Sequence, residues 1–256
     1  MKEKILKNPP LIEVIFELRW ELLKGISSGI NRDPNYKLII GRMYEELKNE
    51  YPFYEQLPTA MIPDDISGYV VQHRFRKDKN KWPLIQIGPG IATLNDTEKY
   101  SWKDFKKRII QLIDTLLKVY PENTLKFNNI MLRYINAISF NFEKENIFNF
   151  LKDQMKVSMT FYSELFKSAN VSKNSTNLDL RVSFPTVKPD GTITIRFARG
   201  KKQNLDALIW ELVINSTSNY LPSDKDNILN WIEESHNLIE DWFFKLIEGE
   251  LLRKFK

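Results

Sequence analysis

The sequence predicts an α+β fold made of two similar halves, each running β-α-β-β-(β)-α. Three observations carry this prediction: alternating apolar and polar stretches typical of half-buried strands, amphipathic stretches at helical spacing, and the same element order on both sides of residue 123. We expect halves at residues 1–123 and 124–256, packed as one compact globular unit. The sheet would be mainly antiparallel with its helices packed on one face, leaving the other face or the groove between halves for a ligand or partner.

The first half opens with a strand over residues 11–20, in which residues 12, 14, 16, 18 and 20 are apolar and Pro9 and Pro10 mark the start. Asp33 before Pro34 predicts an N-cap for a helix ending before Pro52. Residues 69–76 and 83–87 predict a hairpin, and residues 88–90 predict a break or, as this pattern favours, a bulge in the sheet before a strand at 91–94. Ser101 and Asp104 form a capping-box pattern that opens a helix ending before Pro121.

The second half repeats this order, beginning with a long strand over residues 130–142. Residues 146–166 are helical in character, although less cleanly patterned. Strands are expected at 178–184, 192–199 and 207–215, with a turn at residues 188–191 between the first two. The apolar stripe of residues 228–247 predicts a long closing helix.

Composition excludes several classes of site. The 256 residues contain no cysteine, which excludes disulfides, thiolate metal sites and cysteine nucleophiles, and the two histidines are too few for a histidine-rich metal site. No run approaches the roughly 18 apolar residues that a membrane-spanning helix needs, and the start lacks a signal-peptide pattern. We expect a cytoplasmic protein with no cofactor, no metal and no membrane partner.

A net charge of +5 permits an acidic partner such as nucleic acid, although an AT-rich genome enriches lysine without that purpose. Basic residues gather around two predicted hairpins. The candidates for nucleic-acid binding are His73, Arg74, Arg76, Lys77, Lys79 and Lys81 in the first half, with Arg196, Arg199, Lys201 and Lys202 in the second. Alternatively, these residues only keep edge hairpins soluble.

Tyr134 and Asn136 are candidate pocket residues. In a strand they share a face with Leu132 and Ile138, and an asparagine in an apolar row is costly unless it is paired. It is either a polar anchor in a ligand pocket or a partner for nearby backbone. His236, on the apolar stripe of the closing helix, is interpreted as a core histidine.

Phe244 lies off the main stripe of the closing helix and is a candidate contact for a dimer or an effector, unless that helix is buried on two sides. Catalytic residues are not evident. A nuclease would require Asp179 or Glu211 beside a lysine, and the sequence alone does not bring them together.

Three short motifs resemble a known family. They are Asn-Pro-Pro-Leu-Ile-Glu-Val-Ile at residues 8–15, Leu-Arg-Tyr-Ile-Asn at 132–136 and Glu-Gly-Glu-Leu-Leu at 248–252. They resemble a sporadically distributed family of uncharacterised prokaryotic proteins over essentially the whole chain. The family's patchy distribution is typical of genes on mobile or defence islands, and implies a role in antiviral defence beside an effector protein. The resemblance implies no catalytic residues.

We therefore expect a non-enzymatic binding or adaptor protein. Its partner would be an effector protein encoded nearby or a second copy of the chain, with nucleic acid contacted through the basic hairpins. The alternative is a small-molecule-sensing regulator with its ligand in the groove between the halves, an analogy to duplicated regulator modules of similar element order.

Overall fold

An antiparallel sheet of nine strands organises the computed structural model, which describes residues 6–24, 31–63, 66–97, 99–122, 124–167, 170–217, 220–222 and 224–256. The strands of this sheet are β1 (Leu11–Trp20), β4 (Phe53–Gln56), β5 (His73–Arg76), β6 (Leu84–Gly88), β7 (Ile91–Asp96), β8 (Phe127–Ser139), β9 (Asp179–Val187), β10 (Asp190–Lys202) and β11 (Leu205–Thr217). A separate two-stranded ribbon pairs β2 (Leu23–Lys24) with β3 (Asn31–Arg32).

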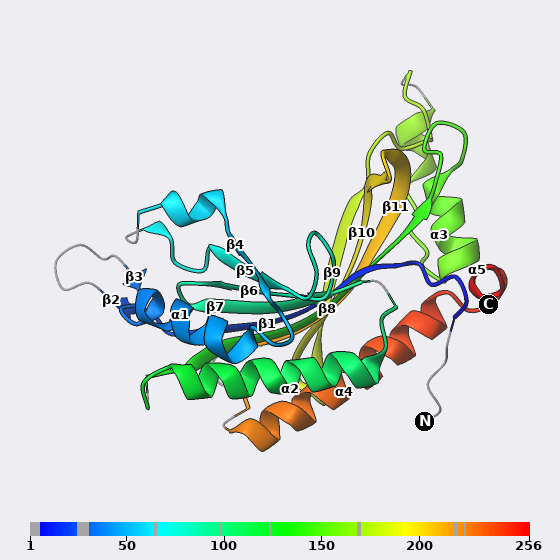
Figure 1. The fold of residues 1–256 in the computed structure, drawn as a ribbon. Coiled ribbons are helices and arrows are strands. Elements are labelled where there is room, and N and C mark those ends of the chain that lie inside the picture. Colours follow the sequence, from blue (N-terminus) through cyan, green and yellow to red (C-terminus); the bar gives the residue numbers. More distant parts are fainter. Residues whose placement is uncertain are drawn as a thin grey trace.

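The helices are α1 (Tyr36–Leu47), α2 (Trp102–Val119), α3 (Ile147–Met155), α4 (Lys225–Leu246) and α5 (Glu250–Phe255), with short 3-10 turns at Pro58–Met61 and Ser163–Phe166. In Figure 1 the long helices α2 and α4 lie beneath the same face of the sheet, and α1 lies beside α2. The α+β class with helices on one face of an antiparallel sheet is therefore confirmed.

The strand order is β4-β5-β6-β7-β1-β8-β11-β10-β9. Strands β1 and β8 lie side by side at the centre. Outward from β1 the neighbours are β7, β6 and β5, and outward from β8 they are β11, β10 and β9. On each side, the strand that comes last along the chain therefore pairs with the strand that comes first. This is the order that two similar β-α-β-β-β-α halves would give, with β4 added at one edge. The boundary at residue 123 stays a prediction.

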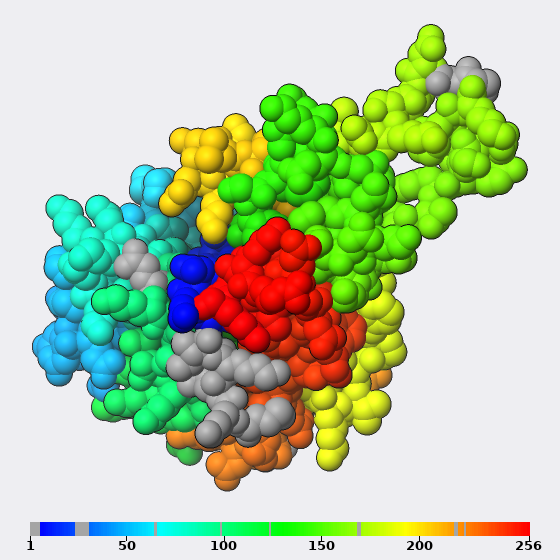
Figure 2. Space-filling model, turned by 90° about the vertical axis from the view of Figure 1, so that its right-hand side faces the viewer, coloured from blue at the N-terminus to red at the C-terminus, as the bar shows by residue number. Residues whose placement is uncertain are grey.

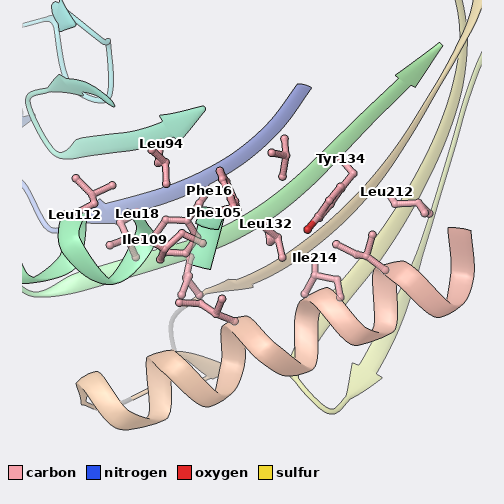
Figure 3. Packing of buried hydrophobic residues seen from close by; sticks show 14 of the residues in the cluster. Phe16, Leu18, Leu94, Phe105, Ile109, Leu112, Leu132, Tyr134, Leu212 and Ile214 are labelled. Carbon is pink, nitrogen blue, oxygen red and sulfur yellow. The ribbon is translucent and has the colours of Figure 1, made fainter. Parts of the chain in front are cut away.

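The core lies between the sheet and the helices. Alternate residues of β1 and β8 point toward the helices, and cross-strand pairs such as Phe16 with Leu132 are fully buried there. Helix α2 contributes Phe105 and Ile109 to the same layer (Figure 3). Each half of the sheet thus buries its apolar face against a long helix of its own.

Two local predictions on the first half are wrong. Asn35, not Asp33, precedes α1, and its side chain makes no capping hydrogen bond. Asp33 Oδ1 accepts from the Asn35 backbone N–H at 3.0 Å, just before α1, while Asp33 Oδ2 accepts from Trp20 Nε1 and from the Tyr120 hydroxyl, both at 2.8 Å. Buried indole and phenol groups need such a partner, so Asp33 ties β1 to the end of α2.

The second error concerns residues 88–90, which form a tight turn rather than a bulge. Strands β6 and β7 pair up to Gly88 opposite Ile91, leaving Pro89 and Gly90 as the two turn residues. Gly90 has φ of +78°, which favours glycine. A bulge does occur, but in β1: the register shifts between Leu11 and Glu13.

The predicted helix over residues 146–166 is shorter than expected. Helix α3 ends at Met155, and Lys156 follows with φ of +55°. The chain beyond it, up to β9, projects from the body of the molecule, as Figure 2 shows. This arm, residues 157–167 and 170–177, exposes Phe161, Tyr162, Leu165 and Val171.

Candidate functional site

A cavity of about 450 Å³ lies where the start of β1 and the end of β8 meet the beginning of α2 and the second half of α4. This is a size that accommodates a small organic ligand. Its apolar wall includes Pro10, Leu11, Tyr100, Trp102, Ile239 and Phe243. Tyr134, Asn136 and His236 supply polar groups to the same wall.

Tyr134 sits at the centre of a chain of hydrogen bonds. Its side chain points from β8 toward α4 (Figure 3), where its hydroxyl lies 2.9 Å from His236 Nδ1. The Tyr100 hydroxyl lies 2.6 Å from the same oxygen. Burial raises the pKa of Tyr134, so it stays protonated. These three side chains satisfy one another without a ligand.

Trp102, the first residue of α2, fixes the imidazole from the other side. Its ring stacks on His236 with centroids 3.9 Å apart and planes at 9°. The Trp102 indole nitrogen donates to Glu233 Oε2 at 3.3 Å, and Lys106 forms an ion pair with the same carboxylate. Burial lowers the pKa of His236 to about 4, opposed by the nearby Glu233, so the ring is neutral at neutral pH.

Asn136 differs from the other polar groups of the wall. Its residue is 2% exposed, and its Nδ2 has no hydrogen-bond partner among the described residues. The β1 bulge lies beside it, because Leu11 pairs with Asn136 while the next pair joins Glu13 to Ile135. Bulges of this kind often lie next to binding sites, where they redirect side chains. The bulge places Leu11 on the cavity.

The charged residues that line the cavity are two lysines and one glutamate, and, after burial, the charge of Glu240 helps to raise the pKa of Tyr134. Lys7 and Lys99 are exposed, and Glu240 is half-buried. The polar groups deeper in the wall, on Tyr134, Asn136 and His236, are uncharged at neutral pH.

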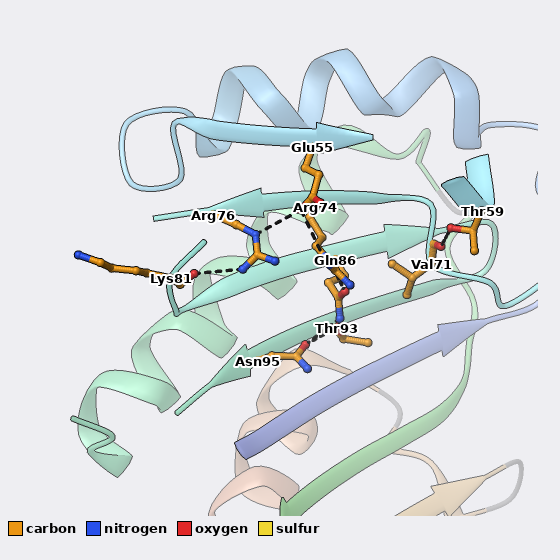
Figure 4. A network of polar contacts seen from close by, with 9 residues as sticks. All are labelled: Glu55, Thr59, Val71, Arg74, Arg76, Lys81, Gln86, Thr93 and Asn95. Carbon is orange, nitrogen blue, oxygen red and sulfur yellow. Dashed lines mark hydrogen bonds and ion pairs between the residues drawn. The ribbon is translucent and has the colours of Figure 1, made fainter. Parts of the chain in front are cut away.

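The predicted basic residues of the first half are largely engaged by other side chains of the chain. Arg74 donates to Gln86 Oε1 at 2.7 Å, and both Arg74 and Arg76 lie within ion-pair distance of Glu55. Figure 4 shows this network continuing to Thr93 and Asn95 across the sheet face without helices. His73 Nδ1 lies 2.7 Å from the Tyr54 hydroxyl, and Lys81 pairs with Asp78. Lys77 and Lys79 lie in the connection after β5.

The basic residues predicted in the second half are also largely engaged by other groups of the protein. Arg196 binds Asp179 at 2.8 Å and Glu211 at 3.1 Å, while Arg133 binds the other oxygen of Glu211 at 2.6 Å. Arg199 forms an ion pair with Asp206, and Lys202 Nζ donates to the Ala137 carbonyl at 3.3 Å. Lys201, near the β10–β11 turn, is exposed. Arg74, Arg76 and Arg196 do point to the same sheet face, but carboxylates already compensate their charge, and nucleic-acid binding stays a prediction.

Asp179 and Glu211, considered for a nuclease, both face Arg196 rather than a lysine. Within the described residues, no group of three or more His, Asp or Glu side chains is arranged to hold a metal ion. None of the helices formed by these residues combines the length and apolar character needed to cross a membrane. Phe244, predicted as a partner contact, is half-buried and packs edge-to-face on Phe243 at the cavity wall.

His236, Tyr100 and Trp102 were missed as site residues. The sequence offered one signal, a histidine on an apolar helical stripe, which is compatible with an ordinary core position. Tyr100 and His236 both reach Tyr134 from sequence separations of 34 and 102 residues, a meeting that local pattern does not reveal.

We predict that Asn136→Leu stabilises the protein. Leucine fills a similar volume and removes a buried amide donor without a partner, so the free energy of unfolding should rise by about 1–3 kcal/mol. Urea unfolding measures this value. The matched control is Asn237→Leu on the exposed side of α4, expected to change stability by less than about 0.5 kcal/mol. A loss of stability in Asn136→Leu would show that the amide has a protein partner.

Stability should also depend on pH through His236. Between its ordinary pKa of 6.5 and the folded value of about 4, the unfolded chain binds a proton that the folded chain does not, so the free energy of unfolding falls as pH falls. From pH 7 to pH 5, wild type should lose about 2 kcal/mol more than His236→Gln. Urea unfolding of both proteins at the two pH values tests this, and equal losses would contradict it.

No protein-family model matches the chain, and no curated protein matches it. The resemblance to the sporadically distributed prokaryotic family, carried by residues 8–15, 132–136 and 248–252, therefore stays a prediction. The function of the site rests on its own geometry.

Proposed function

We propose that the protein binds a small, largely apolar molecule in the cavity between β8, α2 and α4. The observation that carries the proposal is the Asn136 amide, which is 2% exposed and has an unpartnered Nδ2 in the cavity wall. A buried donor without a partner costs free energy. A ligand that supplies the missing acceptor would account for its presence.

The position of the cavity favours a sensor or regulator over an enzyme. Tyr100 and Trp102 come from the chain before β8, whereas Asn136, His236 and Phe243 come from β8 and α4. A ligand there would contact both predicted halves and could change how firmly they hold together.

A screen of small molecules by thermal shift tests the proposal. A ligand that binds only the folded state, at 100 times its Kd, adds about 2.7 kcal/mol to stability and raises Tm. Thr97→Trp places a large side chain at the cavity wall and should abolish the shift. Thr192→Trp, exposed on β10 and outside the cavity lining, should retain it. A shift that is the same in both variants would locate binding elsewhere, and the absence of any shift would contradict the proposal.

A second candidate is the adaptor function, in which the chain associates with an effector protein, in a defence context that only the family resemblance suggests. The observation that favours it is the projecting arm. Tyr162 is 71% exposed and Leu165 61% exposed, and both belong to the arm that projects from the body of the molecule in Figure 2. Large apolar side chains exposed together on a protrusion are typical of a protein contact.

Purification of the tagged protein together with its genomic neighbours tests the adaptor function. Tyr162→Ser with Leu165→Ser should release a co-purifying partner, because the buried apolar area of the contact is lost. Leu38→Ser removes a 71% exposed leucine from α1, away from the arm, and should retain that partner. A wild-type protein that purifies alone, or a partner kept by the arm variant, would argue against this candidate.

A further inference from the structure

We infer that the cavity takes an uncharged, flat aromatic molecule bearing a carbonyl group, and that this carbonyl accepts a hydrogen bond from Asn136 Nδ2. The inference rests on the proposed function, because it specifies the chemistry of the ligand in the same cavity. Three features of the wall carry it: the kind of polar group left unpaired, the lack of a buried cation among the described lining residues, and the shape of the apolar surface.

Two unpaired groups on the sheet beside the cavity are hydrogen-bond donors. Trp210 on β11 lies directly opposite Asn136 on β8, so both side chains point to the same face of the sheet. Trp210 is fully buried, and its Nε1, like Asn136 Nδ2, has no partner among the described residues. An indole N–H group and an amide NH2 group both donate hydrogen bonds and accept none. Two buried donors on neighbouring strands therefore have no acceptor among the described residues.

The acceptor should be uncharged. A ligand carboxylate next to Asn136 would lose its hydration and would gain no cation in exchange. The neighbouring polar groups belong to Tyr134 and to His236, which stays neutral. Burying an unpaired anion is far more costly than burying a neutral carbonyl that is hydrogen-bonded. The two lysines of the cavity, Lys7 and Lys99, are exposed at the rim, where water solvates them.

The apolar surface favours a flat ring. Trp102 and His236 form one stacked slab, and Tyr100 stands edge-on to Tyr134 at 5.8 Å between centroids. Phe243 and Phe244 line the cavity from α4 in an edge-to-face pair. Aromatic groups prefer offset stacked or edge-to-face neighbours, and this wall offers both to a ring. The ring would lie along α4 with its carbonyl toward β8.

Three naphthalene probes of nearly equal size separate these features. Acetylnaphthalene carries the carbonyl, isopropenylnaphthalene replaces its oxygen with a methylene group, and naphthoate carries a negative charge. Affinities are measured by calorimetry at pH 7 on the full chain. Wild type should bind acetylnaphthalene about tenfold more tightly than either of the other two probes, the usual size of one net hydrogen bond.

Asn136→Leu is the variant that assigns the preference. It should bind acetylnaphthalene and isopropenylnaphthalene equally, whereas Asn237→Leu on exposed α4 should keep the tenfold difference. Circular dichroism checks that both variants are folded. A tenfold preference that survives in Asn136→Leu would overturn the assignment to this amide.

The remaining outcomes separate the ligand chemistry from the proposed function. Equal binding of the two neutral probes to wild type, or tightest binding of naphthoate, would overturn the carbonyl assignment while leaving a ligand-binding cavity. The same holds if no probe binds but a screened compound raises Tm in wild type and not in Thr97→Trp. If neither probes nor screened compounds bind, the proposed function fails together with this inference.

Discussion

The antiparallel pairing of β1 with β8 is the interaction on which the rest of the structure depends. These two strands are the centre of the sheet, and each is the point from which its side of the sheet is built outward. Their register sets Val14 opposite Tyr134 and Phe16 opposite Leu132, which aligns the apolar faces of both sides over α2 and α4. Because side chains alternate along a strand, a slip of one residue between β1 and β8 would put the apolar faces of the two sides on opposite faces of the sheet, so that one of them would turn away from the helices. This pairing is irregular near both ends, between Leu11 and Glu13 and between Arg19 and Trp20, and the cavity lies at the first of these two places.

The cavity wall combines polar groups in two different states. Tyr100, Tyr134 and His236 satisfy one another, and Trp102 holds the imidazole in place by stacking. Asn136, one step further along β8, has a buried amide nitrogen without a partner. The first group makes a rigid wall, which limits the conformational entropy that a ligand must overcome on binding. The second provides the single directional contact. A rigid apolar wall with one unpaired donor is an arrangement suited to recognition.

Much of the fold could be predicted because its signals are local. Alternation identified β1 and β8, and the Ser101 and Asp104 pattern located the start of α2. Asn136 stood out because a polar residue in an apolar row is visible without a structure. Other features depend on residues distant in sequence. The Asp33 carboxylate accepts from Trp20 and Tyr120 as well as from the backbone just before α1, and the basic residues face carboxylates on neighbouring strands. His236 became a site residue only because α4 crosses β8 at Tyr134. No pattern within one element contains that information.

The central claim is that Asn136 is a binding group held ready for a ligand acceptor, and a high-resolution crystal structure of the protein purified from its native cells tests it most directly. If Asn136 is such a group, the cavity will contain flat electron density that does not belong to the protein, with an acceptor within about 3 Å of Asn136 Nδ2. A cavity closed by the side chains of Trp102 and Phe243, with the Asn136 amide donating to a protein carbonyl, would contradict it.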